Sequence, residues 1–313
     1  MKSTNKTTKT NHALCGLISG LLLLAAGTAQ THAGLLLPAA PGANLYEGNG
    51  GDSTIKKFTP GGSGSLFANS GLLSPEGLAF DSAGNLYAAY YNSNTIEKFT
   101  PGGTGSVFAS TGLNGPTGLA FDSAGNLYAA NRTNSTIEKF TSGGVGSVFA
   151  STGLNSPRGL AFDSAGNLYA ANALNNTIEK FTPGGVGSVF ASTGLSGPEG
   201  LAFDSAGNLY AANINTNTIE KFTPGGVGSV FASTGLNRPW GLAFDSADNL
   251  YAANDGNNTI EKFTPGGTGS VFASSGLVNP QFLAFGPVPE PTSAALLLGS
   301  GAMLLLRRRR AAV

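Results

Sequence analysis

One stretch of sixteen residues returns along the chain at a constant interval. The first complete copy, PEGLAFDSAGNLYAAY, covers residues 75–90. The phenylalanines of successive copies are 41 residues apart and fall at Phe80, Phe121, Phe162, Phe203, Phe244 and Phe285. A constant period of this size is typical of repeat proteins, in which each unit packs against its neighbours. The period therefore constrains the fold more than any other feature of the chain.

Each 41-residue unit contains four segments with the character of short β-strands. In the unit that begins at Pro116, we expect strands over residues 118–121, 126–130, 136–140 and 146–150. Between the first two lies a hairpin turn, in which Asp122 accepts hydrogen bonds from its own backbone and Gly125 takes a positive φ. Helical repeats would not tolerate so much glycine, 47 residues in all. Four strands in about 40 residues match the blade of a β-propeller.

The number of strands predicts how the ring closes. The Asn-Leu-Tyr strand and the Leu-Ala-Phe strand each occur six times, the former first at Asn44-Leu45-Tyr46 and the latter last at Leu283-Ala284-Phe285. The chain thus starts on the second strand of a blade and ends on a first strand. We predict an all-β, six-bladed β-propeller over residues 43–286, closed by a blade of three N-terminal strands and one C-terminal strand. Such closure removes open sheet edges from the ring.

Three motifs of the unit resemble those of a known family. They are Pro-x-Gly-Leu-Ala-Phe-Asp, Gly-Asn-Leu-Tyr and Asn-x-Thr-Ile-x-x-Phe. Together they resemble the NHL repeat, and the chain is similar to the six-bladed SMP-30 and gluconolactonase group. WD40 repeats fit less well, because the chain has no Trp-Asp and no Gly-His dipeptide. The chain departs from the NHL pattern where an aspartate is common, since it has asparagines at Asn131, Asn172, Asn213 and Asn254.

The overall charge of zero averages over regions that differ. Residues 34–289 contain ten basic and sixteen acidic residues, a net charge of −6. This charge argues against nucleic acid or an anionic membrane as a partner of the repeats. The same region has no cysteine, histidine or methionine. Disulfides, thiolate or imidazole catalysis, and zinc or copper sites built from His or Cys are therefore excluded there.

The N-terminal residues 1–33 are predicted to be a signal peptide, followed by a linker over residues 34–42. Three lysines precede the apolar run 13–26, and Thr31-His32-Ala33 offers a cleavage site. Gly27-Thr28-Ala29 is a second possible cleavage site, and an uncleaved anchor helix is the alternative. A lipoprotein anchor at Cys15 is disfavoured, because Leu14 stands where a small residue is expected and the apolar run continues after the cysteine.

The C-terminal residues 287–313 resemble a PEP-CTERM sorting signal. Its three parts occur in order: Val288-Pro289-Glu290-Pro291, the apolar run 294–306, and Arg307, Arg308, Arg309 and Arg310. The run is short for a complete span, which usually takes about 20 residues, and the arginines would hold its end on the cytoplasmic side. The resemblance implies export in a Gram-negative bacterium and processing by an exosortase, commonly in cells that make extracellular polysaccharide. A plain C-terminal anchor helix is the alternative.

Two parts of the repeat vary between copies, and we expect both on one face of the ring. One is the loop after the second strand, such as Asn131-Arg132-Thr133-Asn134, and the other leads into the first strand. The Asp-Ser-Ala-Gly-Asn turn hardly varies and belongs to the opposite face. The Glu-Lys pairs of the third strand, such as Glu138-Lys139, are interpreted as solvated pairs that link adjacent blades.

The residue after each repeat proline varies most in chemical character. In chain order these residues are Glu76, Thr117, Arg158, Glu199, Trp240 and Gln281. We expect them to ring the mouth of the central channel, with Glu76 opposite Glu199, Thr117 opposite Trp240 and Arg158 opposite Gln281. Carboxylates, a cation and the only tryptophan on one rim suit a polar ligand or a saccharide. The alternative is sequence drift at exposed loop positions.

Two functions follow from these features. The first is an exported, non-catalytic propeller of the cell surface or matrix, which needs no cofactor and binds a polysaccharide or a surface protein. The second, implied by the gluconolactonase resemblance, is a hydrolase or lyase that depends on a divalent metal. Its candidate oxygen ligands for Ca²⁺ or Mg²⁺ are Glu76, Glu199, Asp255, Asn131 and Asn213. Fold analogy alone supports the second function weakly.

Overall fold

The computed structural model of the chain describes residues 42–69 and 73–287. All their regular elements are β-strands, and no helix in them is long and apolar enough to cross a membrane. The predicted signal peptide, the linker before Gly42 and the sorting signal from Val288 onward lie outside the described residues.

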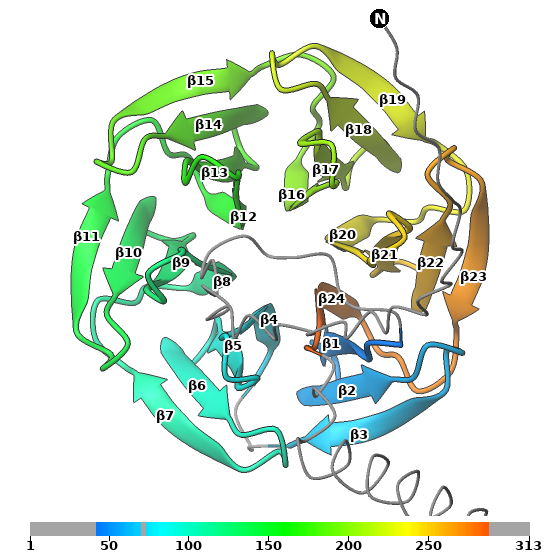
Figure 1. Ribbon diagram of the computed structural model, residues 1–313, viewed down its shortest axis with the longest axis horizontal. Coiled ribbons are helices and arrows are strands. Elements are labelled where there is room, and N and C mark those ends of the chain that lie inside the picture. The colour runs from blue at the N-terminus through cyan, green and yellow to red at the C-terminus, as the bar shows by residue number, and fades with distance from the viewer. Residues whose placement is uncertain (1–41, 70–72, 288–313) are drawn as a thin grey trace, which may run out of the picture. The chain divides into compact units, whose positions relative to one another are not determined.

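Six four-stranded antiparallel sheets form a ring of blades (Figure 1). The innermost strands are β4 (Pro75–Phe80), β8 (Pro116–Phe121), β12 (Pro157–Phe162), β16 (Pro198–Phe203), β20 (Pro239–Phe244) and β24 (Pro280–Phe285). The second strands are β1 (Leu45–Asn49), β5 (Leu86–Tyr90), β9 (Leu127–Asn131), β13 (Leu168–Asn172), β17 (Leu209–Asn213) and β21 (Leu250–Asn254).

Two further strands complete each blade toward the outside of the ring. The third strands are β2 (Thr54–Phe58), β6 (Thr95–Phe99), β10 (Thr136–Phe140), β14 (Thr177–Phe181), β18 (Thr218–Phe222) and β22 (Thr259–Phe263). The outermost are β3 (Gly64–Ala68), β7 (Gly105–Ala109), β11 (Gly146–Ala150), β15 (Gly187–Ala191), β19 (Gly228–Ala232) and β23 (Gly269–Ala273).

The predicted fold and ring closure are confirmed. The closing blade has the strand order β24-β1-β2-β3, and Leu45 of β1 pairs with Phe285 of β24. In the blade that begins at Pro116, the third and fourth strands have the predicted bounds. The first strand begins two residues earlier than predicted, at Pro116, because it includes a β-bulge between Pro116 and Leu119.

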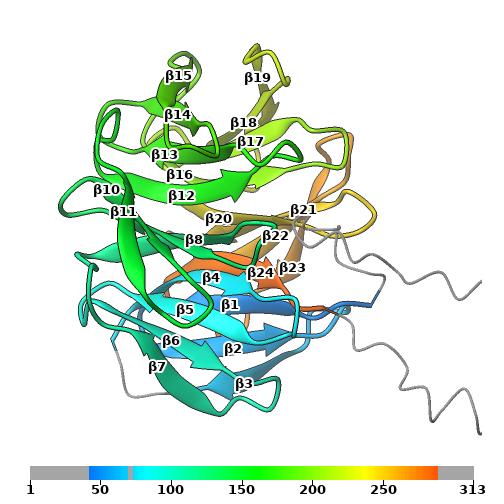
Figure 2. The same cartoon turned by 60° about the vertical axis from the view of Figure 1, so that its left-hand side comes forward.

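The hydrophobic core is divided among the seams between neighbouring blades, which stack face to face (Figure 2). In one seam, Ala130 and Ile137 of one blade pack with Leu168 and Phe181 of the next. The alanines let the inner parts of the blades approach closely. Aromatic rings bridge the seams edge to face: Tyr128 lies 5.1 Å, between ring centroids, from Phe162 of the following blade.

The Asp-Ser-Ala-Gly-Asn turn of the repeat, which we call the aspartate turn, has the predicted geometry and also organises a polar network. Asp122 Oδ1 accepts from the backbone amides of Ala124 and Asn126, at 2.9 and 2.8 Å, and Gly125 has a φ of 79°. Asp122 Oδ2 accepts from Tyr128 Oη at 3.2 Å and lies 3.5 Å from Lys139 Nζ. Lys139 therefore pairs with the aspartate of its own blade.

The interpretation of the Glu-Lys motif as solvated links between blades was wrong. Lys139 is bound within its blade, and Glu138 is buried. Glu138 faces the seam with the preceding blade, where its carboxylate packs against Gly112 in the connection between blades. Glu179, Glu220 and Glu261 pack in the same way against Gly153, Gly194 and Gly235. We call the four seams that contain these glutamates the regular seams.

Asparagine side chains at the ends of the second strands tie down the connections between blades. Asn131 Nδ2 donates to the Gly112 carbonyl oxygen at 2.8 Å, and its Oδ1 accepts from the Asn114 backbone amide at 3.0 Å. The amide can do both because it carries a donor and an acceptor. An aspartate, common here in the NHL pattern, could only accept while ionised.

Both ends of the described propeller lie on the face that carries the aspartate turns. The Gly286 backbone amide donates to the Asn44 carbonyl oxygen at 2.9 Å, and Pro287 packs against Gly84 in the turn after β4. The variable loops lie together on the opposite face, where the Arg132 backbone amide donates to the Gly115 carbonyl oxygen at 3.0 Å.

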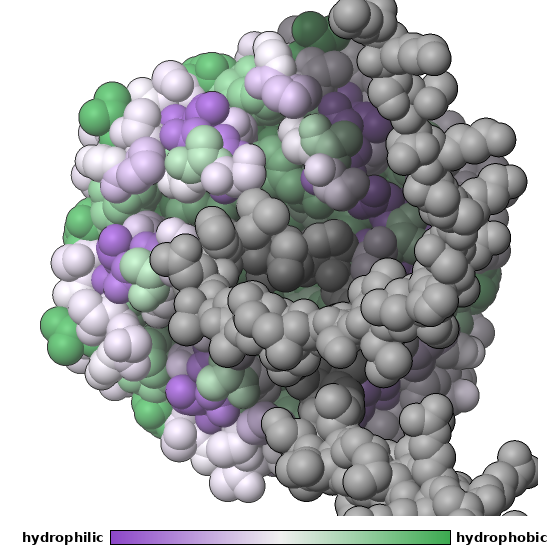
Figure 3. All heavy atoms as spheres, in the orientation of Figure 1, coloured by the Kyte–Doolittle hydropathy of each residue, from purple (hydrophilic) through white to green (hydrophobic). Residues whose placement is uncertain are grey.

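Around the outside of the ring, apolar residues recur at intervals (Figure 3), and valines such as Val148 and Val189 of the outermost strands are exposed.

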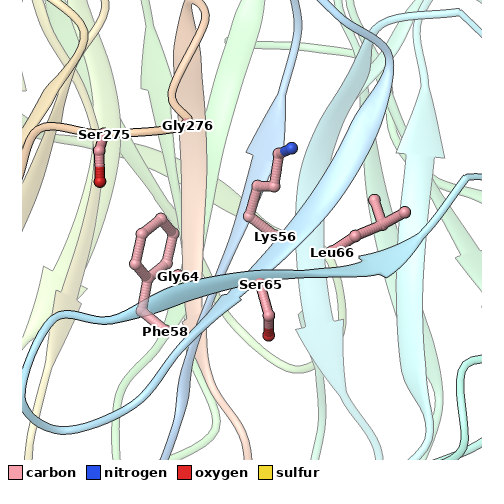
Figure 4. A pocket seen from close by; sticks show the side chains of 7 residues that line it. All are labelled: Lys56, Phe58, Gly64, Ser65, Leu66, Ser275 and Gly276. Carbon is pink, nitrogen blue, oxygen red and sulfur yellow. The ribbon is translucent and has the colours of Figure 1, made fainter.

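The closing seam, between the blade β20–β23 and the closing blade, departs from this pattern. Glu47 and Lys56 are paired across β1 and β2, where the other blades pair alanine with glutamate. Lys56 Nζ lies 3.5 Å from Asp52, and no described residue packs against Gly276 in the way that Glu138 packs against Gly112. A cavity of about 230 Å³ remains there, with Phe58, Leu66 and Ser275 among its lining residues (Figure 4).

Candidate functional site

The six variable positions after the repeat prolines lie inside the innermost strands, not in the loops before them. Each is the second residue of its strand, within the β-bulge that separates, for example, Pro157 from Leu160. A bulge re-aims side chains that a regular strand would alternate between its faces. The order of the inner strands around the ring follows the sequence, so the predicted opposite pairs are also opposite in the structure.

Three of these residues meet although they come from three different blades. Arg158 Nη1 lies 3.1 Å from Glu199 Oε2 of the adjacent blade. The Arg158 guanidinium also stacks on Trp240, two blades away, at 5.4 Å from the ring centroid. The exposed fractions of Arg158 and Glu199 are 6% and 3%, so the pair is largely removed from water. Glu76 interacts electrostatically with Arg158, and Gln281 holds the same strand position between Trp240 and Glu76 around the ring. We call these five residues the central polar cluster.

Several buried polar atoms of the cluster have no hydrogen-bond partner among the described residues. Arg158 Nη1 and Glu199 Oε2 face each other as an ion pair without making a hydrogen bond. Beyond that pair, the unpartnered acceptors are Glu76 Oε2 and Gln281 Oε1, and the unpartnered donors are Arg158 Nε and Trp240 Nε1. Each such atom costs about 1–3 kcal/mol when it is buried without a partner. A bound polar molecule would remove that cost.

Burial also shifts the ionisation of the two carboxyl groups. It raises the pKa of Glu76 to about 7, although the positive charge of Arg158 acts in the opposite direction. Burial likewise raises the pKa of Glu199 to about 7, against the effect of Arg158 and with a smaller contribution from Glu76. Both carboxyl groups therefore titrate near neutral pH.

The remaining predicted residues divide by exposure. Thr117 is fully buried, and its hydroxyl donates to backbone carbonyl oxygens, such as that of Pro157 at 3.1 Å. Its role in the structure is to join two inner strands. Trp240 and Gln281 are partly exposed. Drift at exposed loop positions does not describe the set, because Glu76, Thr117, Arg158 and Glu199 are buried.

The residues proposed to hold a metal are not brought together as one ligand set. The Asn131 and Asn213 amides are engaged in holding the connections between blades. Asp255 lies 3.1 Å from Arg238 Nε and accepts from Asn279 Nδ2. Within residues 42–69 and 73–287, no three His, Cys, Asp or Glu side chains are grouped as a metal site requires. Glu76 and Glu199 remain in the central polar cluster, where Arg158 supplies the positive charge.

Polar side chains of the variable loops extend the site toward the solvent. The Arg132 guanidinium stacks on Tyr91 at 5.1 Å, and its charge acts on both Glu76 and Glu199. The charge of Arg238 also acts on Glu199. These arginines come from the loops that differ between copies of the repeat.

Sequence reasoning missed Glu47. It is fully buried, and neither of its carboxylate oxygens has a hydrogen-bond partner among the described residues. Burial raises its pKa well above the usual value, and the nearby Gln281 backbone amide and Lys56 offset only part of that effect. A comparison of the second strands would have found it, because the other blades have alanine at this position, from Ala88 to Ala252.

Comparisons with known proteins concern the fold. No family model matches the chain, and no curated protein matches it. A chain in the crystal structure of a nidogen/laminin complex is similar, with a TM-score of 0.71 and 23% identity over 78% of this chain and 98% of that one. Virginiamycin B lyase from Staphylococcus aureus has a TM-score of 0.57 and 18% identity, over 67% of this chain and 76% of that one.

A streptogramin B lyase structure gives a similar result, with a TM-score of 0.56 and 16% identity over 79% of this chain and 74% of that one. These relatives have the β-propeller fold in common with the chain. Their identities are too low to carry a ligand or an activity across to it.

Proposed function

We propose that the protein is an exported, non-catalytic binding propeller that holds a polar ligand, of the polysaccharide class, at the central polar cluster. The observation that carries this proposal is the concentration of unpartnered buried polar atoms on Glu76, Arg158, Trp240 and Gln281. Buried polar groups in native proteins are nearly always satisfied, by protein, water or ligand. An aromatic ring beside carboxylate and guanidinium groups suits a hydroxyl-rich ligand.

The residue types around the channel favour binding over catalysis. Residues 42–287 contain no histidine and no cysteine, so the usual nucleophile and base pairs are absent from the described propeller. One lyase with this fold was solved as a catalytically inactive variant in which alanine replaces a histidine. This propeller has no histidine with which to reproduce that chemistry.

The position of the chain ends suits a protein attached to a surface. Both described ends leave from the aspartate-turn face, whereas the variable loops lie on the opposite face. Attachment through the C-terminal segment, in the cell envelope of a Gram-negative bacterium, would direct the variable loops away from the membrane. We propose an exosortase-type enzyme as the processing partner; fractionation of cells with and without that enzyme tests this, since unprocessed protein should accumulate in membranes without it.

A glycan-binding screen of the purified protein tests the proposed function. Trp240→Ala is expected to weaken binding of any captured glycan by about tenfold or more, as removal of a central aromatic contact usually does. Val189→Ala, at an exposed position on the outermost strand β15, is the control and should bind normally. Unchanged glycan binding by Trp240→Ala would contradict the assignment of the binding site to the central polar cluster.

One observation favours the alternative of a metal-dependent hydrolase or lyase. Two carboxyl groups whose pKa lies at about 7 have the ionisation that general acid–base catalysis needs near neutral pH. Calorimetry with Ca²⁺ and Mg²⁺, and assays of lactone hydrolysis with and without chelator, separate the two functions. Tight binding of either ion together with chelator-sensitive turnover would favour the enzyme.

A further inference from the structure

The central polar cluster is enclosed by the six inner strands. Neighbouring strands are so close that a Cβ at Gly118 would collide with the Arg158 carbonyl oxygen, and one at Gly159 with that of Glu199. The pairing of β1 with β24 completes the ring. Access between the described blades is thus closed at this level, and a ligand can arrive only along the ring axis.

The way in lies beside Trp240 and Gln281. These two members of the cluster are partly exposed, whereas Glu76, Arg158 and Glu199 are buried. The indole has one partner already, the Arg158 guanidinium, yet its Nε1 donates to no described residue. A group that enters beside the indole would meet the Arg158 guanidinium, which stacks on the ring and interacts electrostatically with Glu76.

The chemistry of the unpartnered atoms selects the kind of group that fits. Apart from the Arg158–Glu199 pair, two atoms accept, Glu76 Oε2 and Gln281 Oε1, and two donate, Arg158 Nε and Trp240 Nε1. Hydroxyl groups match this even division because each donates and accepts. An anionic group would meet two carboxyl groups, and a cationic group would meet Arg158.

We propose that the cluster recognises the terminal sugar of a neutral glycan, inserted end-on along the ring axis, and not the middle of a glycan chain. The middle of a glycan that lies across the channel cannot enter between the inner strands, whereas the end of a glycan presents several hydroxyl groups at once. This inference rests on the proposed function and sharpens it, since it names the part of the polymer that binds.

The test compares long and short preparations of the same glycan at equal mass. The probes are dextran, mannan, galactan and oligomers of N-acetylglucosamine, each intact and after partial hydrolysis, with alginate as an acidic polymer. Shortening the chains tenfold raises the number of ends tenfold, so half-saturation is expected at about one tenth of the mass concentration. Alginate is expected not to compete.

Each result decides one of the claims. Binding that follows the mass of glycan and not the number of ends overturns the end-on inference but leaves the proposed function. Preferential binding of alginate also overturns the inference. Failure of every glycan to bind overturns both. Trp240→Ala and Gln281→Ala should each abolish the dependence on chain ends, and Val189→Ala should keep it. Two independent variants guard against a folding defect in one.

Discussion

The regular seams and the closing seam have nearly the same backbone but bury different charges. A regular seam pairs an alanine with a glutamate, as in Ala170 and Glu179, and the glutamate carboxylate packs against a glycine of the adjoining connection. The closing seam pairs Glu47 with Lys56 and leaves a cavity beside Gly276. In the closing blade the buried glutamate stands on the second strand instead of the third, and its oxygens have no partner among the described residues.

This difference indicates that the closing seam is stabilised by its apolar contacts and not by its charged residues. The apolar contacts are retained, since Leu45, Phe58 and Leu283 pack against Tyr251 and Ile260 of the preceding blade. What distinguishes the closing seam is a carboxyl group on its second strand whose oxygens have no partner among the described residues, which is costly. Four sets of substitutions test this difference between the seams.

The largest effect is expected from adding a second-strand glutamate to a regular seam. Ala170→Glu places a carboxyl group in a fully buried position opposite Glu179 and should lower the free energy of unfolding by roughly 3 kcal/mol or more. Urea unfolding followed by circular dichroism measures it. Leu174→Glu, at an exposed loop position, should change little. A loss below about 1 kcal/mol for Ala170→Glu would mean that the seams tolerate carboxyl groups generally.

The reverse change, Glu47→Ala, should stabilise the protein by about 1–3 kcal/mol at pH 8. Burial raises the pKa of Glu47 above its unfolded value. Wild-type stability is therefore greatest below the unfolded pKa and falls as the pH rises through the folded one. The variant should lack this loss, so the two proteins should differ least near pH 4. Glu47→Gln, which keeps the volume but cannot ionise, should also lose the pH dependence; thermal melting across pH decides.

A smaller loss of unfolding free energy, about 1–2 kcal/mol, is expected when an asparagine that both kinds of seam have in common is removed. Asn172 and Asn49 each bind the connection of their own seam, Asn172 Nδ2 through Gly153 and Asn49 Nδ2 through Gly276. Alanine at either position should cost a similar amount, read from urea midpoints. A much smaller cost at Asn49 would show that the closing seam also lacks this support.

The smallest effect concerns the polar network of the aspartate-turn face. Lys180→Met removes a partly exposed ion pair with Asp163, 3.7 Å between Nζ and Oδ2, and should cost about 0.5 kcal/mol. Burial would raise the pKa of Asp163, but hydrogen bonds from Asn167 and the charge of Lys180 lower it overall. The contribution is thus present above the unfolded pKa and lost as the pH falls through the folded one.

Lys57→Met in the closing blade is the matched control for that change. Lys57 stacks on Tyr46 at 5.7 Å, and the first strand of the closing blade is followed by Gly286 where the other blades have the aspartate. Its replacement should have almost no effect and no acid dependence. Equal effects at Lys57 and Lys180 would show that the aromatic ring, and not the aspartate, is the partner that matters.

The sequence alone determined the number of blades, the closure of the ring and the geometry of the aspartate turn. Each depends on local chemistry repeated at a constant period: Asp122 and Gly125 shape a turn wherever they occur, and counting strands predicts the closing pair. The same reasoning marked Glu76, Arg158, Glu199 and Trp240 as unusual, because identical surroundings made their differences visible.

The contacts of these residues, and the burial of particular charges, follow from the packing of the blades and could not be read from the repeat. Arg158 meets Trp240 across 82 positions of sequence, because a bulge re-aims each side chain and ring closure brings the inner strands around one axis. Glu138 is buried and Glu47 lacks a partner for the same reason: burial is set by the neighbouring blade. A repeat pattern specifies each blade, whereas distances across the ring and the environment of a seam arise only when the blades pack.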